Sequence, residues 1–271
     1  MNQEELNKII QKFADKQYKK DVDNSQVRKI ISSSMDDFLQ FWHEFNEDFE
    51  DYTKADDSRL AAKKLKAKLD KLAKKYSIKT KGVANNDDLL QYATYVHSSA
   101  LAKDLVKYTG GEFSNEAAES IAFGATAYNV NFKNSVKQIN ELVNGTIDKT
   151  LWSDRIWSSM DVLRSDLLKD MKHSLLTHHN PVTRTNELRK RYSVARYQAE
   201  RILRTESSRV MAQSGINSIQ KAGYEKVVWV ANSKACDECQ SHIGQVYTLK
   251  QAQGVLPWHP NCRCSWSAYV D

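Results

Sequence analysis

The sequence is poor in the residues that normally end and reverse short elements. Only 9 glycines and 3 prolines occur among its 271 residues, which favours long helices over many short strands. No window approaches the eighteen uninterrupted apolar residues of a membrane-spanning helix. The first residues also lack the apolar segment and cleavage site of a signal peptide. We therefore expect a mainly α protein that is made in the cytoplasm and stays soluble there.

Cysteine is absent from the first 235 residues, and all 4 cysteines occur together near the C-terminus. The pattern is C-x2-C, then nineteen residues, then H-x2-C-x-C, and its members are Cys236, Cys239, His259, Cys262 and Cys264. In a reducing compartment, clustered cysteines are more often metal ligands or redox groups than a disulfide framework. This C-terminal cluster is the first candidate for a functional site.

Apolar residues recur at three- and four-residue intervals through most of the remaining chain, as on one face of an amphipathic helix. Gly110 and Gly111 are expected to end one helix, and Ser193 is expected to cap the start of another. The predicted helices cover residues 25–49, 60–76, 87–108, 114–143, 152–178, 183–192 and 193–223.

Charge is distributed unevenly, although the net charge of +6 and the pI near 8.9 indicate only a mild basic bias. An acidic segment, 36–57, is followed by a lysine-rich segment, 63–75, and the two could pair as adjacent helices. For the lysines we favour a solvated helix face, and a phosphate contact is the alternative.

Three runs of β-branched and aromatic residues, 226–230, 245–249 and 264–270, have the length of strands and enclose the cysteines. The predicted fold is therefore mainly α, an elongated helical body with a small three-stranded, zinc-stapled β module at the C-terminus (α+β). The expected regions are an N-terminal helical hairpin or arm (1–80), a middle helical region (81–148) and a C-terminal module (149–271), whose β part is 226–271.

The helix before the cysteines carries a carboxylate, Glu206, at the border of its apolar face. A carboxylate in that position needs a partner, which Arg209 or Arg204 could supply. We interpret Arg204, Thr205, Glu206 and Arg209 as a structural polar network. A general acid or base is disfavoured, since no second carboxylate or histidine lies close in sequence.

Zinc is the metal that the cluster chemistry favours, because it takes four thiolate or imidazole ligands in a tetrahedron. Cys236 and Cys239 form one pair, and His259 with Cys262 can form the second. Cys264 competes with Cys262, or with His259 in an all-cysteine site, and His242 is a weaker further candidate. We predict a structural zinc that stabilises a β module with little core of its own.

Two other interpretations of the cluster stay open. Two disulfides or a thioredoxin-like redox pair would also use these cysteines, although the sequence around C-x2-C predicts strands rather than the helix that lowers a thiol pKa. A catalytic zinc would keep one position for water and need a carboxylate such as Asp237, Glu238 or Glu206. Because the donors suffice to close the shell, we predict no catalytic residue.

Four motifs together give the chain a resemblance to a known family. They are an Arg-Thr-Glu helix (204–206), the C-x2-C pair, a G-x-V-Y strand (244–247) and a final H-P-x-C-R-C (259–264). The combination resembles the C-terminal module of phage Mu F-like minor head, or head morphogenesis, proteins, over about residues 150–270. The family's Asp-x-x-Thr before the first cysteine is replaced by residues 232–235, Asn-Ser-Lys-Ala.

The resemblance implies a minor capsid protein of a tailed phage or prophage, located inside the virion at the portal vertex. Its implied partners are the portal protein and the packaged DNA, the latter by weak non-specific contact, with scaffolding or major capsid protein as further candidates and no membrane. It would enter the procapsid during assembly and leave with, or guide, the DNA at ejection. The competing hypotheses are a metal-dependent nucleic-acid hydrolase, with Glu206 or Glu238 as base, and a zinc-ribbon nucleic-acid-binding protein.

Overall fold

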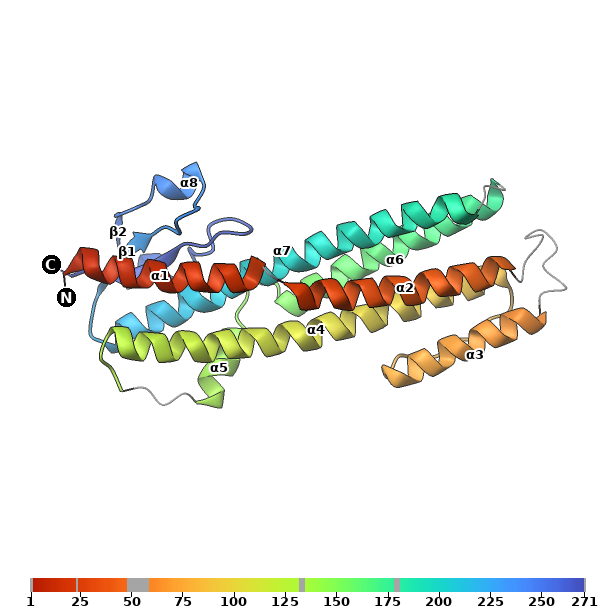
Figure 1. The fold of residues 1–271 in the computed structure, drawn as a ribbon. Helices are drawn as coiled ribbons and strands as arrows, with labels where there is room; N and C mark the ends of the chain where they lie inside the picture. The colour runs from red at the N-terminus through yellow and green to blue at the C-terminus, as the bar shows by residue number, and fades with distance from the viewer. Residues whose placement is uncertain (1, 23, 48–58, 132–134, 178–180, 271) are drawn as a thin grey trace. The chain divides into compact units, whose positions relative to one another are not determined.

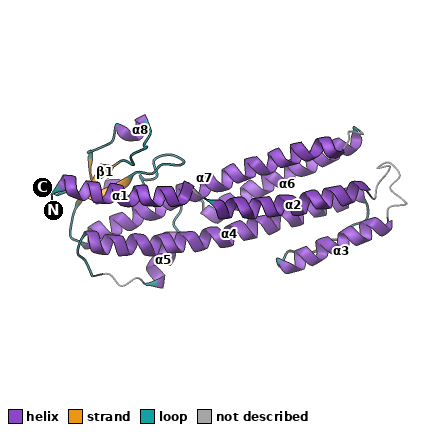
Figure 2. Cartoon of the chain, in the orientation of Figure 1, coloured by secondary structure: helices purple, strands orange, loops and turns teal. Residues whose placement is uncertain are grey.

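The computed structural model describes residues 2–22, 24–47, 59–131, 135–177 and 181–270. Helices account for most of them, and the strands are confined to the C-terminal part (Figures 1 and 2). The predicted fold class, mainly α with a small C-terminal sheet, is confirmed. No helix in this described part is both long enough and apolar enough to cross a membrane.

The elements follow one another in an order that places every strand after the last long helix. The helices are α1 (Gln3–Val22), α2 (Ser25–Glu47), α3 (Arg59–Lys75), α4 (Asn86–Ala127), α5 (Val136–Val143), α6 (Trp152–Leu176), α7 (Pro181–Lys221), α8 (Asp237–Gln240) and α9 (Leu249–Ala252). The strands are β1 (Lys226–Val230), β2 (Val246–Thr248) and β3 (Ser265–Ala268), close to the three predicted runs.

The described chain forms two compact units that are interleaved in sequence. The first unit comprises Met1–Asn24, Tyr108–Trp152 and Glu200–Asp271, and the second comprises Ser25–Lys107 and Ser153–Ala199. Helices α4 and α7 each contribute residues to both units, so the unit boundaries fall inside helices. They do not coincide with the boundaries at residues 80 and 148 that the sequence suggested.

The first unit is built around the antiparallel sheet, whose strand order is β2-β1-β3. Helix α1 lies against β3, and the side chain of Gln3 donates to the Ala268 carbonyl and accepts from the Val270 amide. Apolar residues of α1, α7 and the sheet share one core that also contains three of the cysteines. This core includes Leu6, Ile10, Ile216, Ile219, Val227, Trp229, Trp266, Cys239, Cys262 and Cys264.

The second unit is a helical assembly with an aromatic core. Phe38, Trp42 and Phe45 of α2 are buried, which confirms the stripe predicted for that helix. Leucines of α3 cover part of the assembly, with Leu65 and Leu69 buried. Helix α6, within the predicted range 152–178, buries the apolar stripe Ile156, Met160, Leu163, Leu167 and Met171.

The predicted helix end at Gly110 and Gly111 is wrong, because α4 runs through both residues. Packing explains the continuity: a Cβ atom on Gly110 would lie 3.2 Å from the ring of Trp152, and that ring packs edge-on against Phe113. This close contact leaves little room for a side chain at position 110, which favours glycine there even within a helix. The following helix does not reach 143 unbroken either, since α4 ends at Ala127 and α5 begins only at Val136.

The predicted boundary at Ser193 is also wrong, because α7 is continuous from Pro181 to Lys221. The Ser193 hydroxyl donates to the Arg189 carbonyl within the helix and does not cap it, a use of serine that helix interiors allow. Helix α1 lies in a stretch for which no helix was predicted, since it lacks an aromatic stripe.

Two glycines of α4 provide a matched test of this packing. A Cβ atom on Gly124 would lie 2.2 Å from the Ser218 hydroxyl oxygen of α7, whereas one on Gly111 would meet nothing within 4 Å. We expect Gly124→Ala to lower the free energy of unfolding by about 1–3 kcal/mol through overpacking. Gly111→Ala should raise it by about 0.5–1 kcal/mol through helix propensity. Urea unfolding of both variants measures the difference, and equal shifts of the same sign would contradict the α4–α7 approach.

Candidate metal centre

Two loops of the first unit bring the predicted ligands together. Cys236 caps the start of α8 and Cys239 lies within it. His259 and Cys262 come from the loop between α9 and β3, and Cys264 directly precedes β3. The sheet register holds the two loops at the same end, because Val230 at the end of β1 pairs with Ser265 at the start of β3.

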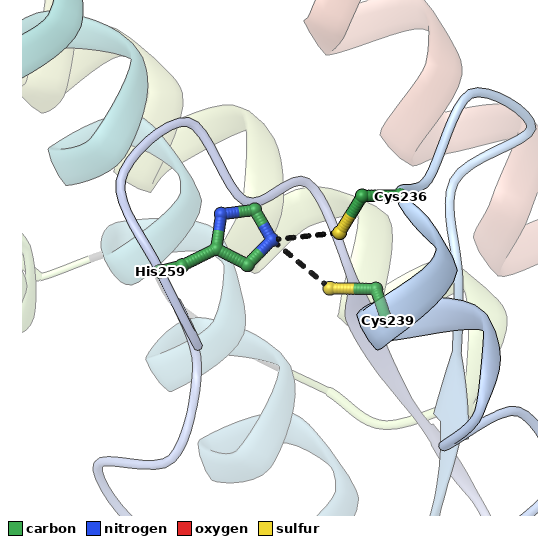
Figure 3. A group of neighbouring side chains, drawn as sticks. All are labelled: Cys236, Cys239 and His259. Carbon is green, nitrogen blue, oxygen red and sulfur yellow. Dashed lines mark hydrogen bonds between the residues drawn. The ribbon is translucent and has the colours of Figure 1, made fainter.

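The five side chains form two overlapping groups that share Cys239. In one group are Cys236, Cys239 and His259, and in the other Cys239, Cys262 and Cys264, with all ligand atoms of each group within 4.8 Å of one another. The His259 Nε2 atom lies 3.2 Å from the Sγ atoms of both Cys236 and Cys239, as Figure 3 shows. The Sγ atoms of Cys239 and Cys262 are 3.7 Å apart.

These separations suit a tetrahedral metal ion. Two sulfurs at about 2.3 Å from a tetrahedral zinc lie roughly 3.8 Å from each other, and the Cys239–Cys262 separation matches that edge. The site also opens onto a cavity of ≈ 440 Å³, which gives an ion a route to it. Each group thus offers three donors at separations that fit a metal, and a fourth donor would come from the other group.

The imidazole of His259 is oriented for metal binding. Its Nδ1 atom lies 2.8 Å from the Pro260 carbonyl oxygen, an acceptor, so Nδ1 carries the proton and donates. The Nε2 atom then keeps a lone pair that faces the two sulfurs of Cys236 and Cys239 (Figure 3). A hydrogen bond from the second ring nitrogen commonly fixes a metal-binding histidine in this way.

The pKa values of the clustered thiols are shifted in opposite directions. A hydrogen bond from the Cys264 thiol lowers the pKa of Cys262 to about 5, whereas burial raises the pKa of Cys239 to about 12. The hydrogen bond with Cys262 raises the pKa of the Cys264 thiol. One thiolate is therefore stabilised by neighbours that stay protonated, and a divalent cation is what would allow several of these thiols to ionise together.

The further candidates are not part of this arrangement. His242 stacks on Trp229 with ring centroids 4.6 Å apart, and its Nδ1 atom faces Gln245 and Tyr247. No carboxylate belongs to either ligand group within the described residues. Glu238 instead accepts a hydrogen bond from the Trp258 indole, and the cavity beside the cluster is lined by no aspartate or glutamate.

The expectation that no helix accompanies C-x2-C is wrong, because the one-turn helix α8 starts directly after Cys236. The backbone amide of Cys239 donates to Cys236 and lowers the pKa of that exposed thiol. Spacing could not predict a turn this short. All cysteines are reduced in the structure.

The Arg-Thr-Glu helix holds the second ligand loop through Asn261. The Arg204 Nε atom donates to the Asn261 side-chain oxygen over 2.9 Å, and the Asn261 amide donates to the Thr205 hydroxyl over 3.0 Å. Asn261 has a positive φ of 64°, a conformation that asparagine tolerates better than most residues. Asn261, which directly precedes Cys262, is thus fixed to α7.

Glu206 and Arg209 form a buried ion pair on the same helix. The Arg209 Nε atom donates to Glu206 over 2.6 Å, and its two terminal nitrogens donate to the Leu142 and Val143 carbonyls at the end of α5. A cation at a helix C-terminus is favourable. A Cβ atom on Gly145 would lie 2.2 Å from Arg209 Nη1, so a larger residue there would displace the guanidinium from these contacts.

Sequence reasoning missed Asp15 and Asn261. Asp15 of α1 accepts hydrogen bonds from the Asn232 side chain and the Ser233 amide and hydroxyl, just before Cys236. A carboxylate thus reaches the position where the resembling family has its own acid, but it comes from α1. Asn261 stood inside the quoted motif, whereas no local signal could connect residues 15 and 232.

Arg209 is expected to be the most sensitive residue of this network. Arg209→Leu leaves the carboxylate of Glu206 buried without its cation, and we expect a loss of about 3–5 kcal/mol in the free energy of unfolding. The double variant Glu206→Leu, Arg209→Leu should recover part of that loss. Exposed Arg196 of α7 is the matched control, and Arg196→Leu should change stability by no more than about 0.5 kcal/mol. Chemical denaturation compares the four proteins, and similar losses for Arg209→Leu and Arg196→Leu would refute this role.

One comparison with known proteins gives a match, and it covers this part of the chain. Residues 171–267 match the family model described as Phage Mu protein F like protein. No curated protein and no solved structure matches the chain. The matched range contains α7, the sheet and every candidate ligand, and so it includes all four motifs that suggested the resemblance. Residues 171–267 of this chain are therefore similar to the Phage Mu protein F like family.

Proposed function

We propose that the protein is a minor component of a tailed-phage or prophage head that acts in head morphogenesis. The observation that supports this most directly is the family match over residues 171–267. The structure adds a physical reason for the motifs to occur together, since Arg204 and Thr205 hold the loop that carries His259 and Cys262. The proposed location is the virion, at the portal vertex.

The metal centre is proposed to be a structural zinc site with Cys236, Cys239, His259 and Cys262 as ligands. Cys262 is preferred to Cys264 because its sulfur lies at a tetrahedral edge length from Cys239. When bound, zinc would supply a cross-link between the α8 loop and the loop held by α7. The protein's own residues orient the ligands through the Pro260 carbonyl and the Asn261 contacts.

The zinc proposal predicts about one zinc per chain in the reduced protein, measured by elemental analysis. Chelation should lower the melting temperature, since zinc held at a thousand times its Kd stabilises the folded state by about 4 kcal/mol. Cys236→Ser and Cys262→Ser should lose the metal, whereas Cys264→Ser should retain it.

His242→Ala serves as the matched control, because His242 is a potential ligand by type that faces Gln245 and Tyr247. It should bind zinc like the unchanged protein. Undamaged, reduced protein without zinc would overturn the metal assignment. Loss of zinc in Cys264→Ser but not in Cys262→Ser would exchange the roles of those two cysteines.

The portal protein is the proposed partner, and the helices of the second unit are the proposed binding element. Large apolar side chains are exposed on α6 and α7, including Val162 (61%), Val194 (57%) and Tyr197 (53%). Exposed apolar side chains on helices are suited to contact with another helical protein. The protein would then enter the procapsid with the portal during assembly, contact packaged DNA, and leave with or guide the DNA at ejection.

Co-expression with the portal protein of the same phage or prophage tests the partner. We expect the two proteins to co-elute in size-exclusion chromatography, and Val194→Asp with Tyr197→Asp should reduce the bound fraction at least about tenfold, as for central interface residues. The matched control is Ile243→Asp with Val246→Asp, which changes two exposed apolar residues of the first unit. Failure to associate, together with absence of the chain from purified virions, would contradict the proposed function.

The hydrolase alternative requires a carboxylate beside the metal. Glu206 forms an ion pair with Arg209, and Glu238 accepts a hydrogen bond from the Trp258 indole. These contacts favour a structural role for the site over a hydrolytic one. The zinc-ribbon alternative is disfavoured by composition, since the last strands lack a dense cluster of arginine and lysine.

A further inference from the structure

Helix α3 presents a continuous face of lysines to solvent. Its apolar side is turned inward, with Leu65, Leu69 and Ala73 buried. Among residues 63–75, at 100° per residue, the exposed lysines fall within an arc of about 140° on the opposite side, and Ala67 is the only other residue of that stretch on the arc. We call this set the lysine face, and its members are Lys63, Lys64, Lys68, Lys71, Lys74 and Lys75.

Most of this charge is not neutralised by the described part of the chain. Lys68 pairs with Glu44 of α2 over 2.5 Å, and Lys66, which lies outside the face, pairs with Asp70 over 2.6 Å. Within the described residues, no ion pair forms at Lys63, Lys64, Lys71, Lys74 or Lys75. Like charges three and four residues apart destabilise a helix, so the face gains stability from an external anion.

The geometry of the face is linear. Lys64, Lys68, Lys71 and Lys75 follow the i, i+4, i+7, i+11 spacing of one helix side, and from Lys63 to Lys75 the axial rise is about 18 Å. Double-stranded DNA carries one negative charge per about 1.7 Å of axis. A straight row of cations on a rigid helix therefore matches a duplex backbone in both sign and extent.

The composition of the lysine face favours a phosphate backbone over other acidic partners. Protein interfaces have an apolar centre, but no large apolar side chain is exposed on the described part of α3. Membrane-surface helices insert an apolar stripe, whereas the stripe of α3 is buried. Lysine is a point charge that does not read base edges as arginine does, so contact would be independent of sequence.

We propose that the lysine face of α3 docks the phosphate backbone of double-stranded nucleic acid. The proposal rests on the arrangement of charges on α3 and does not depend on the family match, which begins at residue 171. It also places nucleic-acid contact in the second unit, away in sequence from the cysteine cluster.

The test compares two triple variants of the full chain. Lys64→Gln, Lys71→Gln and Lys74→Gln remove three charges from the lysine face, and glutamine keeps similar helix propensity. Lys107→Gln, Lys169→Gln and Lys250→Gln remove three exposed lysines from three other helices. Each triple variant lowers the formal net charge of +6 by three, so net charge is matched. Circular dichroism verifies the fold of both.

Binding of a fluorescent 30-base-pair DNA duplex of arbitrary sequence is measured by anisotropy between about 50 and 200 mM salt. We expect the lysine-face variant to reduce the slope of log K against log salt by about 2.7, and the affinity near 0.1 M salt at least about tenfold. The control should change affinity less than about twofold. Lys64→Arg, Lys71→Arg and Lys74→Arg, which keep the charge, should restore binding.

Three results would overturn the proposal. The lysine-face variant could bind the duplex like the unchanged protein. The control could lose as much affinity as the lysine-face variant, so that binding follows net charge alone. Finally, poly-glutamate or phosphatidylserine vesicles could bind in a manner that depends on the lysine face while the duplex does not, which would assign the face to an acidic protein or a membrane.

Discussion

A buried guanidinium, that of Arg209, joins helices α5 and α7 of the first unit. It forms an ion pair with Glu206 on its own helix. It also caps α5 by donating hydrogen bonds to the last two carbonyls of that helix. Each of these groups would be costly to bury alone. Once α7 is fixed to α5 in this way, Arg204 and Thr205 stand one turn earlier on the same helix, where they hold Asn261. The order of residues in the Arg-Thr-Glu motif thus follows from what each contacts.

The cysteine cluster is both part of the core and a candidate metal site. Cys239, Cys262 and Cys264 are buried with Trp229 and Trp266, so they exclude solvent whether or not a metal is bound. The small sheet has only twelve residues in its three strands, and a sheet of that size needs support from elsewhere. Helix α1 supplies part of it, and the proposed zinc would supply more. Helix α1 packs against β3 and also holds, through Asp15, the segment just before Cys236.

Much of this arrangement could be predicted from local sequence, and two of the failures share one cause. The stripes of α2 and α6, the three strands and the cysteine pattern depend on spacing along the chain, which the sequence displays directly. The continuity of α4 through Gly110 depends on Trp152, and the support of the Cys236 loop depends on Asp15. Both are contacts between residues far apart in sequence, and no propensity or motif contains them. The prediction at Ser193 failed for another reason. A serine that hydrogen-bonds within a helix cannot be distinguished in the sequence from one that caps a helix.

The side chain of Gln3 contacts Ala268 and Val270, 265 and 267 residues away, and this separation bears on how the chain folds during synthesis. All residues of the second unit have been made by Ala199, whereas the first unit also needs the last seventy residues or so. Domains form as units as the chain emerges, and contacts between distant residues are slow to close. The second unit can therefore fold before β3, the strand against which α1 packs, has been synthesised. The candidate metal ligands follow the second unit in the chain, so any ion that they hold is captured after the second unit has been synthesised.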